Sequence, residues 1–131
     1  MPEVIPSKYK DLFDKKIFAS LVTLMPDGSP QVSTIWIDRD GDDVLFNTAE
    51  GRVKTDNLRR DGRIAISVFD QRDHDEQVIV RGTVVDMTTE GADEHIDFLA
   101  KKYLGADTYP FRDPEEQRVI VRVRPDHVSD G

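Results

Sequence analysis

The sequence predicts a mainly β fold: a small antiparallel barrel of six strands with short flanking helices. Six short segments of alternating or wholly apolar residues, rich in Val and Ile, recur between turn residues such as Gly, Pro and Asp. Helical spacing is clearest at the start of the chain and near its end, whereas a parallel βαβ array needs helices that alternate with strands. We therefore expect one domain over residues 1–131.

A short amphipathic helix is predicted over residues 8–16. Tyr9, Leu12, Phe13 and Ile17 have the spacing of one helical face, and Pro and Ser directly before the segment are typical start signals.

Three strands in a meander follow. Residues 18–24 alternate in polarity and end at the turn sequence Met-Pro-Asp-Gly at 25–28. Residues 30–38 are expected to form the second strand, Asp40-Gly41 supplies a hairpin turn, and residues 44–46 begin the third strand.

The middle of the chain combines one basic stretch with two apolar strands. Residues 50–63 are compatible with a helix and form the one basic island in an acidic chain. Residues 64–69 and 77–87 are predicted strands. Gly82 inside the second of these indicates a bulge or a bend of the barrel.

A second helix is predicted over residues 88–104, with Thr89 or a neighbour as its cap, early acids and late lysines. Gly105 ends it, and the alternation of residues 118–123 predicts a last strand that stops before Pro125. The apolar face of the helix is Ile96, Leu99, Ala100 and Tyr103.

Composition excludes several classes of function. The chain has no cysteine, so it has no thiolate metal site and no thiol nucleophile, and redox chemistry would need a bound cofactor. A net charge of -8 argues against a nucleic-acid or anionic-membrane binder. No apolar run approaches the roughly 20 residues that span a bilayer, and no signal peptide is evident. We expect a cytoplasmic protein.

The residues best suited to bind a ligand lie at the end of the third predicted strand. Thr48, Arg52 and Lys54 lie close together where the strand runs into a turn and a helix N-terminus. Free backbone N–H groups, a bidentate Arg and a Lys make a suitable cradle for a phosphate. On spacing alone, a solvated basic turn that pairs with Asp56 and Asp61 is an equally good interpretation.

The wider sequence resembles the pyridoxamine 5'-phosphate oxidase-like family. The resemblance extends over nearly the whole chain, including residues 23–32 and 102–110. It implies an FMN-binding split β-barrel that works as a homodimer with the cofactor at the subunit interface. The residues that carry it are Thr48, Arg52, Lys54, Asn57, Leu58, Arg63, Ala65, Val68, Phe69, Val78, Val80, Gly82 and Val84.

Within that family the chain is most similar to the branch that depends on coenzyme F420, a deazaflavin. The segments that indicate this branch are Asp-Gly-Ser-Pro-Gln at 27–31, Asn-Leu-Arg-Arg-Asp at 57–61 and Lys-Tyr-Leu-Gly at 102–105. FMN oxidases of the family carry an Arg and a Lys on the second strand, where this chain has Gln31, Ser33 and Thr34.

The resemblance therefore implies an oxidoreductase that uses F420 for hydride transfer to an unidentified small organic substrate. The alternatives are an FMN-dependent reductase or oxidase, or a non-catalytic protein that binds F420 or a flavin. No catalytic side chain is identified, since the cofactor performs the redox step and the last proton can come from solvent.

The same resemblance implies a set of cofactor-binding residues with distinct roles. Arg52 and Lys54 would hold the phosphate, and Gln77 would reach the cofactor from the other subunit. The residues expected to line the ring or the pocket are Gln31, Val32, Ser33, Asn47, Thr48 and Asn57.

Other chemistry-bearing residues are expected to be structural. His74, His95 and His127 lack the spacing of a metal motif, and His95 is interpreted as a surface residue of the second helix. Trp36 could stack on a tricyclic ring but is favoured as a core or interface aromatic. Tyr109 could reach the pocket.

Overall fold

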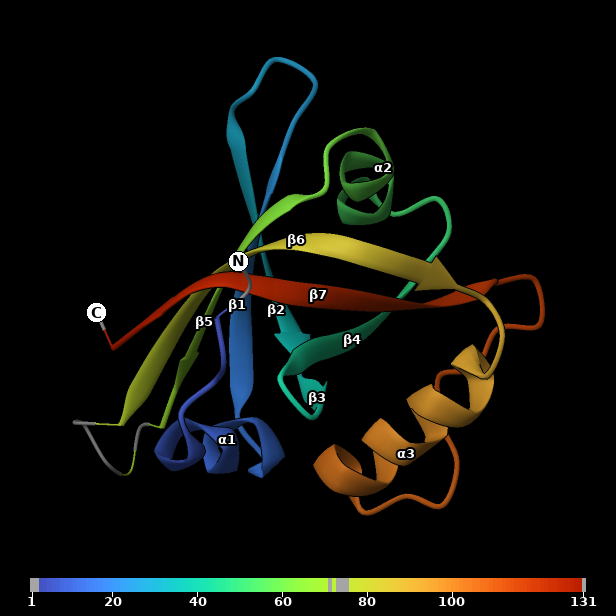
Figure 1. Cartoon of the computed structure of the whole chain (residues 1–131). Coiled ribbons are helices and arrows are strands. Elements are labelled where there is room, and N and C mark those ends of the chain that lie inside the picture. The colour runs from blue at the N-terminus through green and yellow to red at the C-terminus, as the bar shows by residue number, and fades with distance from the viewer. Residues whose placement is uncertain (1–2, 71, 73–75, 131) are drawn as a thin grey trace.

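In the computed structural model, which describes residues 3–70, 72 and 76–130, seven strands form one antiparallel sheet in the order β2-β1-β5-β6-β7-β4-β3 (Figure 1). Three short helices flank this sheet. The elements are α1 (Ser7–Asp14), β1 (Phe18–Leu24), β2 (Pro30–Trp36), β3 (Asp38–Asp40), β4 (Asp43–Ala49), α2 (Val53–Arg60), β5 (Arg63–Phe69), β6 (Gln77–Thr88), α3 (Ala92–Leu104) and β7 (Arg118–Ser129).

The two edges of the sheet are consecutive in the chain. β2 ends at Trp36 and β3 starts at Asp38, so a single residue, Ile37, joins one edge to the other. The sheet must therefore curl into a barrel, which confirms the predicted antiparallel barrel, although it has seven strands where six were predicted. The prediction of one strand over 30–38 was wrong in one detail, because the Ile37 amide donates to Tyr103 Oη (2.9 Å) and the strand changes partner there.

The barrel interior holds the main core. On β1, Ala19, Leu21 and Thr23 are buried while their neighbours face outward, as the alternation predicts. Corresponding apolar residues of β4, β5, β6 and β7 fill the same interior. The largest fully buried side chains of the chain are Phe13, Phe46, Ile5, Leu12, Leu21, Ile37, Ile66, Leu99, Val44, Val68, Val78 and Val80.

The strands β6 and β7 cross closely at Gly82. The register shifts there, which confirms the predicted irregularity, and a Cβ on Gly82 would lie 2.5 Å from the Arg124 carbonyl oxygen. The last strand does not stop before Pro125 as predicted but continues to Ser129. Pro125 has no N–H to donate to a neighbouring strand. It is tolerated because β4 pairs with β7 only as far as Val123, so β4 does not pair with Pro125.

The helices cover the ends and one side of the barrel. α1 and α2 lie at opposite ends, and α3 lies beside β4 and β7 (Figure 1). α3 begins later than predicted, at Ala92, because Gly91 precedes it with φ of 75°, and no side-chain hydrogen bond caps it. Within the described residues, no helix has the length and apolar character needed to span a membrane.

Candidate functional site

A pocket of about 180 Å³ lies where the first turn of α2 meets β2, β4, α3 and β7. It brings together three of the residues predicted from the sequence, Asn47, Arg52 and Lys54. The remaining lining residues are Thr34, Ile35, Trp36, Ile96, Leu99, Tyr109 and Arg118. The pocket thus has an apolar and aromatic side and a cationic side.

Arg118 is the most firmly held cation of the pocket. It is buried at the start of β7, and its Nε donates to Asn47 Oδ1 (2.8 Å) while its Nη1 donates to Glu116 Oε1 (2.6 Å). Its guanidinium carbon lies 5.4 Å from the centroid of the Tyr109 ring. These contacts fix the direction of the guanidinium, and the sequence prediction did not include it.

Arg52 and Lys54 reach the pocket from the N-terminus of α2. Arg52 Nη2 pairs with Glu116 Oε2 at 3.2 Å. Lys54 is half-buried, and no described residue forms an ion pair with it. Burial, together with the neighbouring charges of Arg52 and Arg118, lowers the pKa of Lys54. Three cations therefore line one pocket, and Glu116 pairs with two of them, Arg52 and Arg118.

Thr48 holds the turn that carries Arg52 instead of lining the pocket. The Thr55 hydroxyl donates to the Ala49 carbonyl (2.8 Å), so the buried Thr48 hydroxyl is the donor in its 3.0 Å contact with Thr55 Oγ1. These two contacts tie the end of β4 to the first turn of α2. The predicted convergence of a hydroxyl with two cations holds for the cations only.

Asn57 is buried and joins α2 to the barrel. Its Nδ2 donates to Thr23 Oγ1 (3.0 Å), and its Oδ1 accepts from Arg60 Nη2 (2.9 Å). The Thr23 hydroxyl in turn donates to Gln31 Oε1 (3.0 Å). Asn57 and Gln31 are therefore linked in one hydrogen-bonded chain, and neither lines the pocket.

The remaining predicted residues lie elsewhere. On β2, Gln31 Nε2 donates to Ser33 Oγ (3.0 Å) and Val32 is exposed, and the pocket-lining residue of this strand is Thr34. Gln77 starts β6 and donates to the Asp130 carbonyl (3.0 Å). Contact of Gln31, Val32, Ser33 and Gln77 with a cofactor stays a prediction.

Two aromatic residues left out of the predicted set line the pocket. Trp36 stacks on Tyr103, with ring centroids 5.0 Å apart and 5° between the planes, and Tyr109 meets Trp36 edge-on at 6.1 Å. Tyr103 itself is buried, as its position on the apolar face of α3 predicted. Trp36 lies two residues after Thr34 on β2, which also lines the pocket.

His95 is not a surface residue, contrary to the prediction. Its side chain is only 10% exposed, and Nε2 lies 3.0 Å from Asp38 Oδ2. Asn47 Nδ2 lies 3.2 Å from its other ring nitrogen. Sequence neighbours could not reveal this, because both partners come from distant strands. His127 is exposed and pairs with Glu3, and His74 lies outside the described residues.

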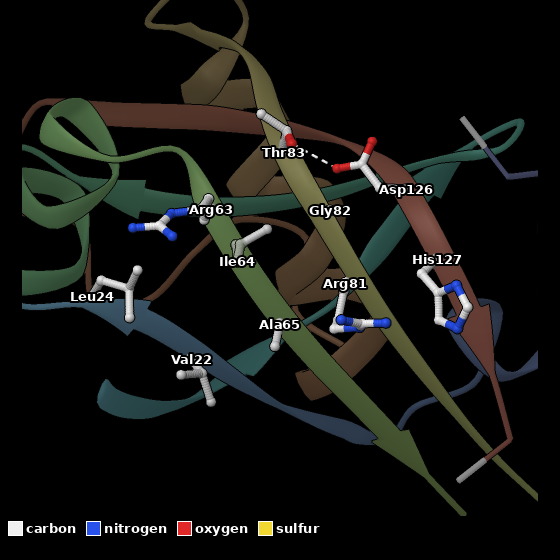
Figure 2. Close-up of a pocket in the computed structure, with 10 residues that line it drawn as sticks. All are labelled: Val22, Leu24, Arg63, Ile64, Ala65, Arg81, Gly82, Thr83, Asp126 and His127. Carbon is white, nitrogen blue, oxygen red and sulfur yellow. Dashed lines mark hydrogen bonds between the residues drawn. The ribbon is translucent and has the colours of Figure 1, made fainter. Parts of the chain in front are cut away.

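A larger hollow of about 560 Å³ lies on the outer face of β1, β5, β6 and β7, as Figure 2 shows. Apolar residues such as Val22 and Ala65 form part of its wall, and Thr83 Oγ1 donates to Asp126 Oδ2 (2.6 Å) at one edge. None of the residues predicted for the cofactor site lines it. Two arginines line this hollow, Arg63, which Asp61 holds at 2.7 Å, and Arg81.

Comparison with known proteins decides the family. The sequence profile described as "Pyridoxamine 5'-phosphate oxidase" matches residues 5–130. The chain belongs to the pyridoxamine 5'-phosphate oxidase family. No curated protein matches this family member in sequence.

Solved structures share the split barrel of this pyridoxamine 5'-phosphate oxidase family member. A protein titled "F420 Reductase" superposes with a TM-score of 0.85 and 29% identity, over 97% of this chain and 100% of that one. A conserved hypothetical protein from Mycobacterium tuberculosis gives 0.72 at 20% identity, over 97% and 84%. HupZ from Group A Streptococcus gives 0.69 at 18% identity, over 95% and 92%, and these last two show the fold alone.

Proposed function

We propose that this protein is a cytoplasmic oxidoreductase that uses coenzyme F420 for hydride transfer to an unidentified small organic substrate. We further propose that it works as a homodimer with the cofactor at the subunit interface. FMN is the alternative cofactor, and a non-catalytic cofactor-binding protein is the alternative role.

The single observation that carries the proposal is the excess of cations in the pocket. Arg52 and Arg118 share one carboxylate, Glu116, and Lys54 is half-buried without an ion-pair partner among the described residues. Three like charges held together cost free energy unless an anion neutralises them. A phosphate group, which takes bidentate contacts from Arg and a point charge from Lys, fits this set.

Two observations favour F420 over FMN. The second strand carries Gln31, Ser33 and Thr34 where FMN oxidases of the family carry an Arg and a Lys. The "F420 Reductase" structure is similar to this chain over the full length of both. Neither observation names the substrate.

The side chains of this protein would bind and orient the cofactor. Arg52, Lys54 and Arg118 would hold its phosphate, Asn47 fixes Arg118, and Trp36 offers an apolar flank to the ring. The cofactor would supply the redox chemistry that these side chains lack. Gln31, Val32, Ser33, Thr48, Asn57 and Gln77 remain proposed contacts.

The test is an equilibrium fluorescence titration of the purified protein with F420 and, in parallel, with FMN. The variant Arg52→Ala/Lys54→Ala removes two pocket cations, and we expect its affinity to fall by about a hundredfold, since each charged contact contributes roughly 1.5 kcal/mol or more. The matched control is Arg59→Ala/Lys101→Ala, which removes the same charge at exposed positions outside the pocket.

The outcomes separate the alternatives. Tighter binding of F420 than of FMN, lost in the pocket variant and kept in the control, supports the proposal, and turnover with reduced F420 then distinguishes an enzyme from a carrier. Tighter binding of FMN moves the protein to the FMN alternative. Equal affinity in both double variants would mean that the phosphate is bound elsewhere.

A further inference from the structure

A chain of hydrogen bonds leads from the cation pocket to a largely buried histidine. Arg118 Nε donates to Asn47 Oδ1 (2.8 Å), and Asn47 Nδ2 donates to the Ala92 carbonyl (2.8 Å) and lies 3.2 Å from His95 Nδ1. His95 Nε2 lies 3.0 Å from Asp38 Oδ2. The side chains of His95 and Asp38 are 10% and 16% exposed. The chain thus connects β7, β4, α3 and β3.

The partners of Asn47 fix its orientation and, through it, the protonation of His95. An arginine can only donate and a backbone carbonyl can only accept, so the amide oxygen must face Arg118 and the amide nitrogen must face Ala92. The same amide nitrogen faces His95 Nδ1, which must therefore be an unprotonated acceptor. The neutral ring then carries its proton on Nε2 and donates it to Asp38.

We propose that His95, held by Asp38, is a positioning residue for the cation pocket: its neutral form permits the orientation of Asn47 that binds Arg118, and its protonation releases Arg118. The inference rests on the proposed function in one respect, namely that the pocket binds an anion. The link between His95 and Arg118 does not depend on any ligand.

Protonation of His95 would put two donors face to face. A proton on Nδ1 would point at the amide nitrogen of Asn47. Rotation of the amide would relieve that clash, but it would turn the amide oxygen toward the Ala92 carbonyl and the amide nitrogen toward the Arg118 guanidinium. Both new contacts are repulsive. Asn47 therefore cannot accept a hydrogen bond from Arg118 and also one from the protonated Nδ1 of His95.

Several charged groups lie around His95. Asp38 on β3 faces Nε2 of the ring, and Arg118 on β7 lies behind the neutral Asn47 of β4. Burial raises the pKa of Asp38, but hydrogen bonds from His95 and the Arg39 amide, with the charge of Lys102, keep the pKa lowered overall. Asp38 is therefore a carboxylate at neutral pH. The acids beside His95 on α3 are Asp93, Glu94 and Asp97, and Arg112 pairs with Asp93 and Asp97.

The first measurement is a ¹⁵N NMR pH titration of the ligand-free protein from about pH 5 to 8, the range in which histidines ordinarily titrate. We expect a neutral His95 protonated on Nε2, and an Arg118 Nε–H signal that moves with the same midpoint as the His95 ring. An Nδ1-protonated ring, or an Arg118 signal that does not follow His95, would overturn the inference.

Three variants sharpen this measurement. His95→Asn keeps an acceptor near the Nδ1 position without a titrating ring, so the Arg118 signal should become independent of pH. Asp38→Asn removes the charge of the partner of His95 Nε2, and the His95 ring and the Arg118 signal should still share one midpoint. His127→Asn, at an exposed histidine outside the pocket, should leave the profile unchanged.

The second measurement is the affinity for F420 and FMN at about pH 8 and pH 5.5. We expect roughly tenfold weaker binding by the wild type at low pH, and no such pH-dependent loss in His95→Asn or His95→Ala. The FMN phosphate itself titrates near pH 6, and it does so with both proteins. The difference between His95→Asn and the wild type therefore excludes its contribution.

The two measurements distinguish a failure of the inference from a failure of the proposed function. If Arg118 follows His95 in the NMR titration but neither cofactor binds, the proposed function fails and the positioning of Arg118 by His95 stands. If the cofactors bind through Arg52 and Lys54 but wild type and His95→Asn share one pH profile, the inference fails and the proposed function stands.

Discussion

Tyr103 Oη accepts a hydrogen bond from the amide of Ile37 at 2.9 Å and donates one to the Ile17 carbonyl at 2.7 Å. Ile37 is the one residue between β2 and β3, where the chain stops pairing with β1 and starts pairing with β4. Lys102 Nζ binds the carbonyl of the same residue at 2.7 Å. The end of α3 thus closes the barrel by satisfying both backbone groups of Ile37 with side chains.

The first prediction concerns this closure. Tyr103→Phe should lower the free energy of unfolding by about 2 to 3 kcal/mol, because it leaves the buried Ile37 N–H and the Ile17 carbonyl without their partner. Urea denaturation measures the change. Tyr9→Phe, which removes an exposed hydroxyl contact to Asp130, should cost less than about 0.5 kcal/mol. Equal losses in the two variants would contradict a special role for Tyr103.

The second prediction concerns alkaline pH. Burial raises the pKa of Tyr103 from 10.0 to about 12. A pKa that is higher in the folded state gives stability that is complete below pH 10 and is lost as the pH rises through about 12. The wild type should therefore lose stability over this window more steeply than Tyr103→Phe. Parallel curves for the two proteins would show that Tyr103 does not titrate as described.

The third prediction concerns the close crossing of β6 and β7. In Gly82→Ala, the new Cβ would lie 2.5 Å from the Arg124 carbonyl oxygen and 2.8 Å from a methyl group of Val123. Because a backbone atom cannot move away cheaply, we expect a loss of about 1 to 3 kcal/mol in thermal or urea unfolding. In the control Gly62→Ala the nearest atom lies at 3.5 Å, and stability should hardly change.

The fourth prediction separates stability from binding. Lys54→Met removes a half-buried charge that Arg52 and Arg118 disfavour, so the ligand-free protein should gain about 0.5 to 1 kcal/mol in stability. The same variant should bind F420 at least tenfold more weakly. Inorganic phosphate should stabilise the wild type more than the variant in thermal unfolding. A less stable Lys54→Met protein would show that the pocket cations do not repel one another.

Much of the fold followed from local patterns. The alternation of residues 18–24 predicts which side chains of β1 enter the core, and the turn residues predict where most strands end. Gly82 predicts an irregularity in β6 for a steric reason that the structure confirms. Arg52 and Lys54 stood out because a basic stretch is conspicuous in an acidic chain, and they do line a common pocket.

Other features depended on contacts between distant parts of the chain. The break at Ile37 is made by a residue 66 positions away, and Arg118 joins Asn47 across 71 positions. The burial of His95 likewise depends on Asp38, 57 positions before it. Sequence periodicity reports which face of one element is apolar, but it carries no information on which polar group of another element will meet that face. The sequence by itself therefore determined the barrel and the cations at the start of α2, whereas only the tertiary structure decided that Arg118, Trp36 and His95 belong beside them.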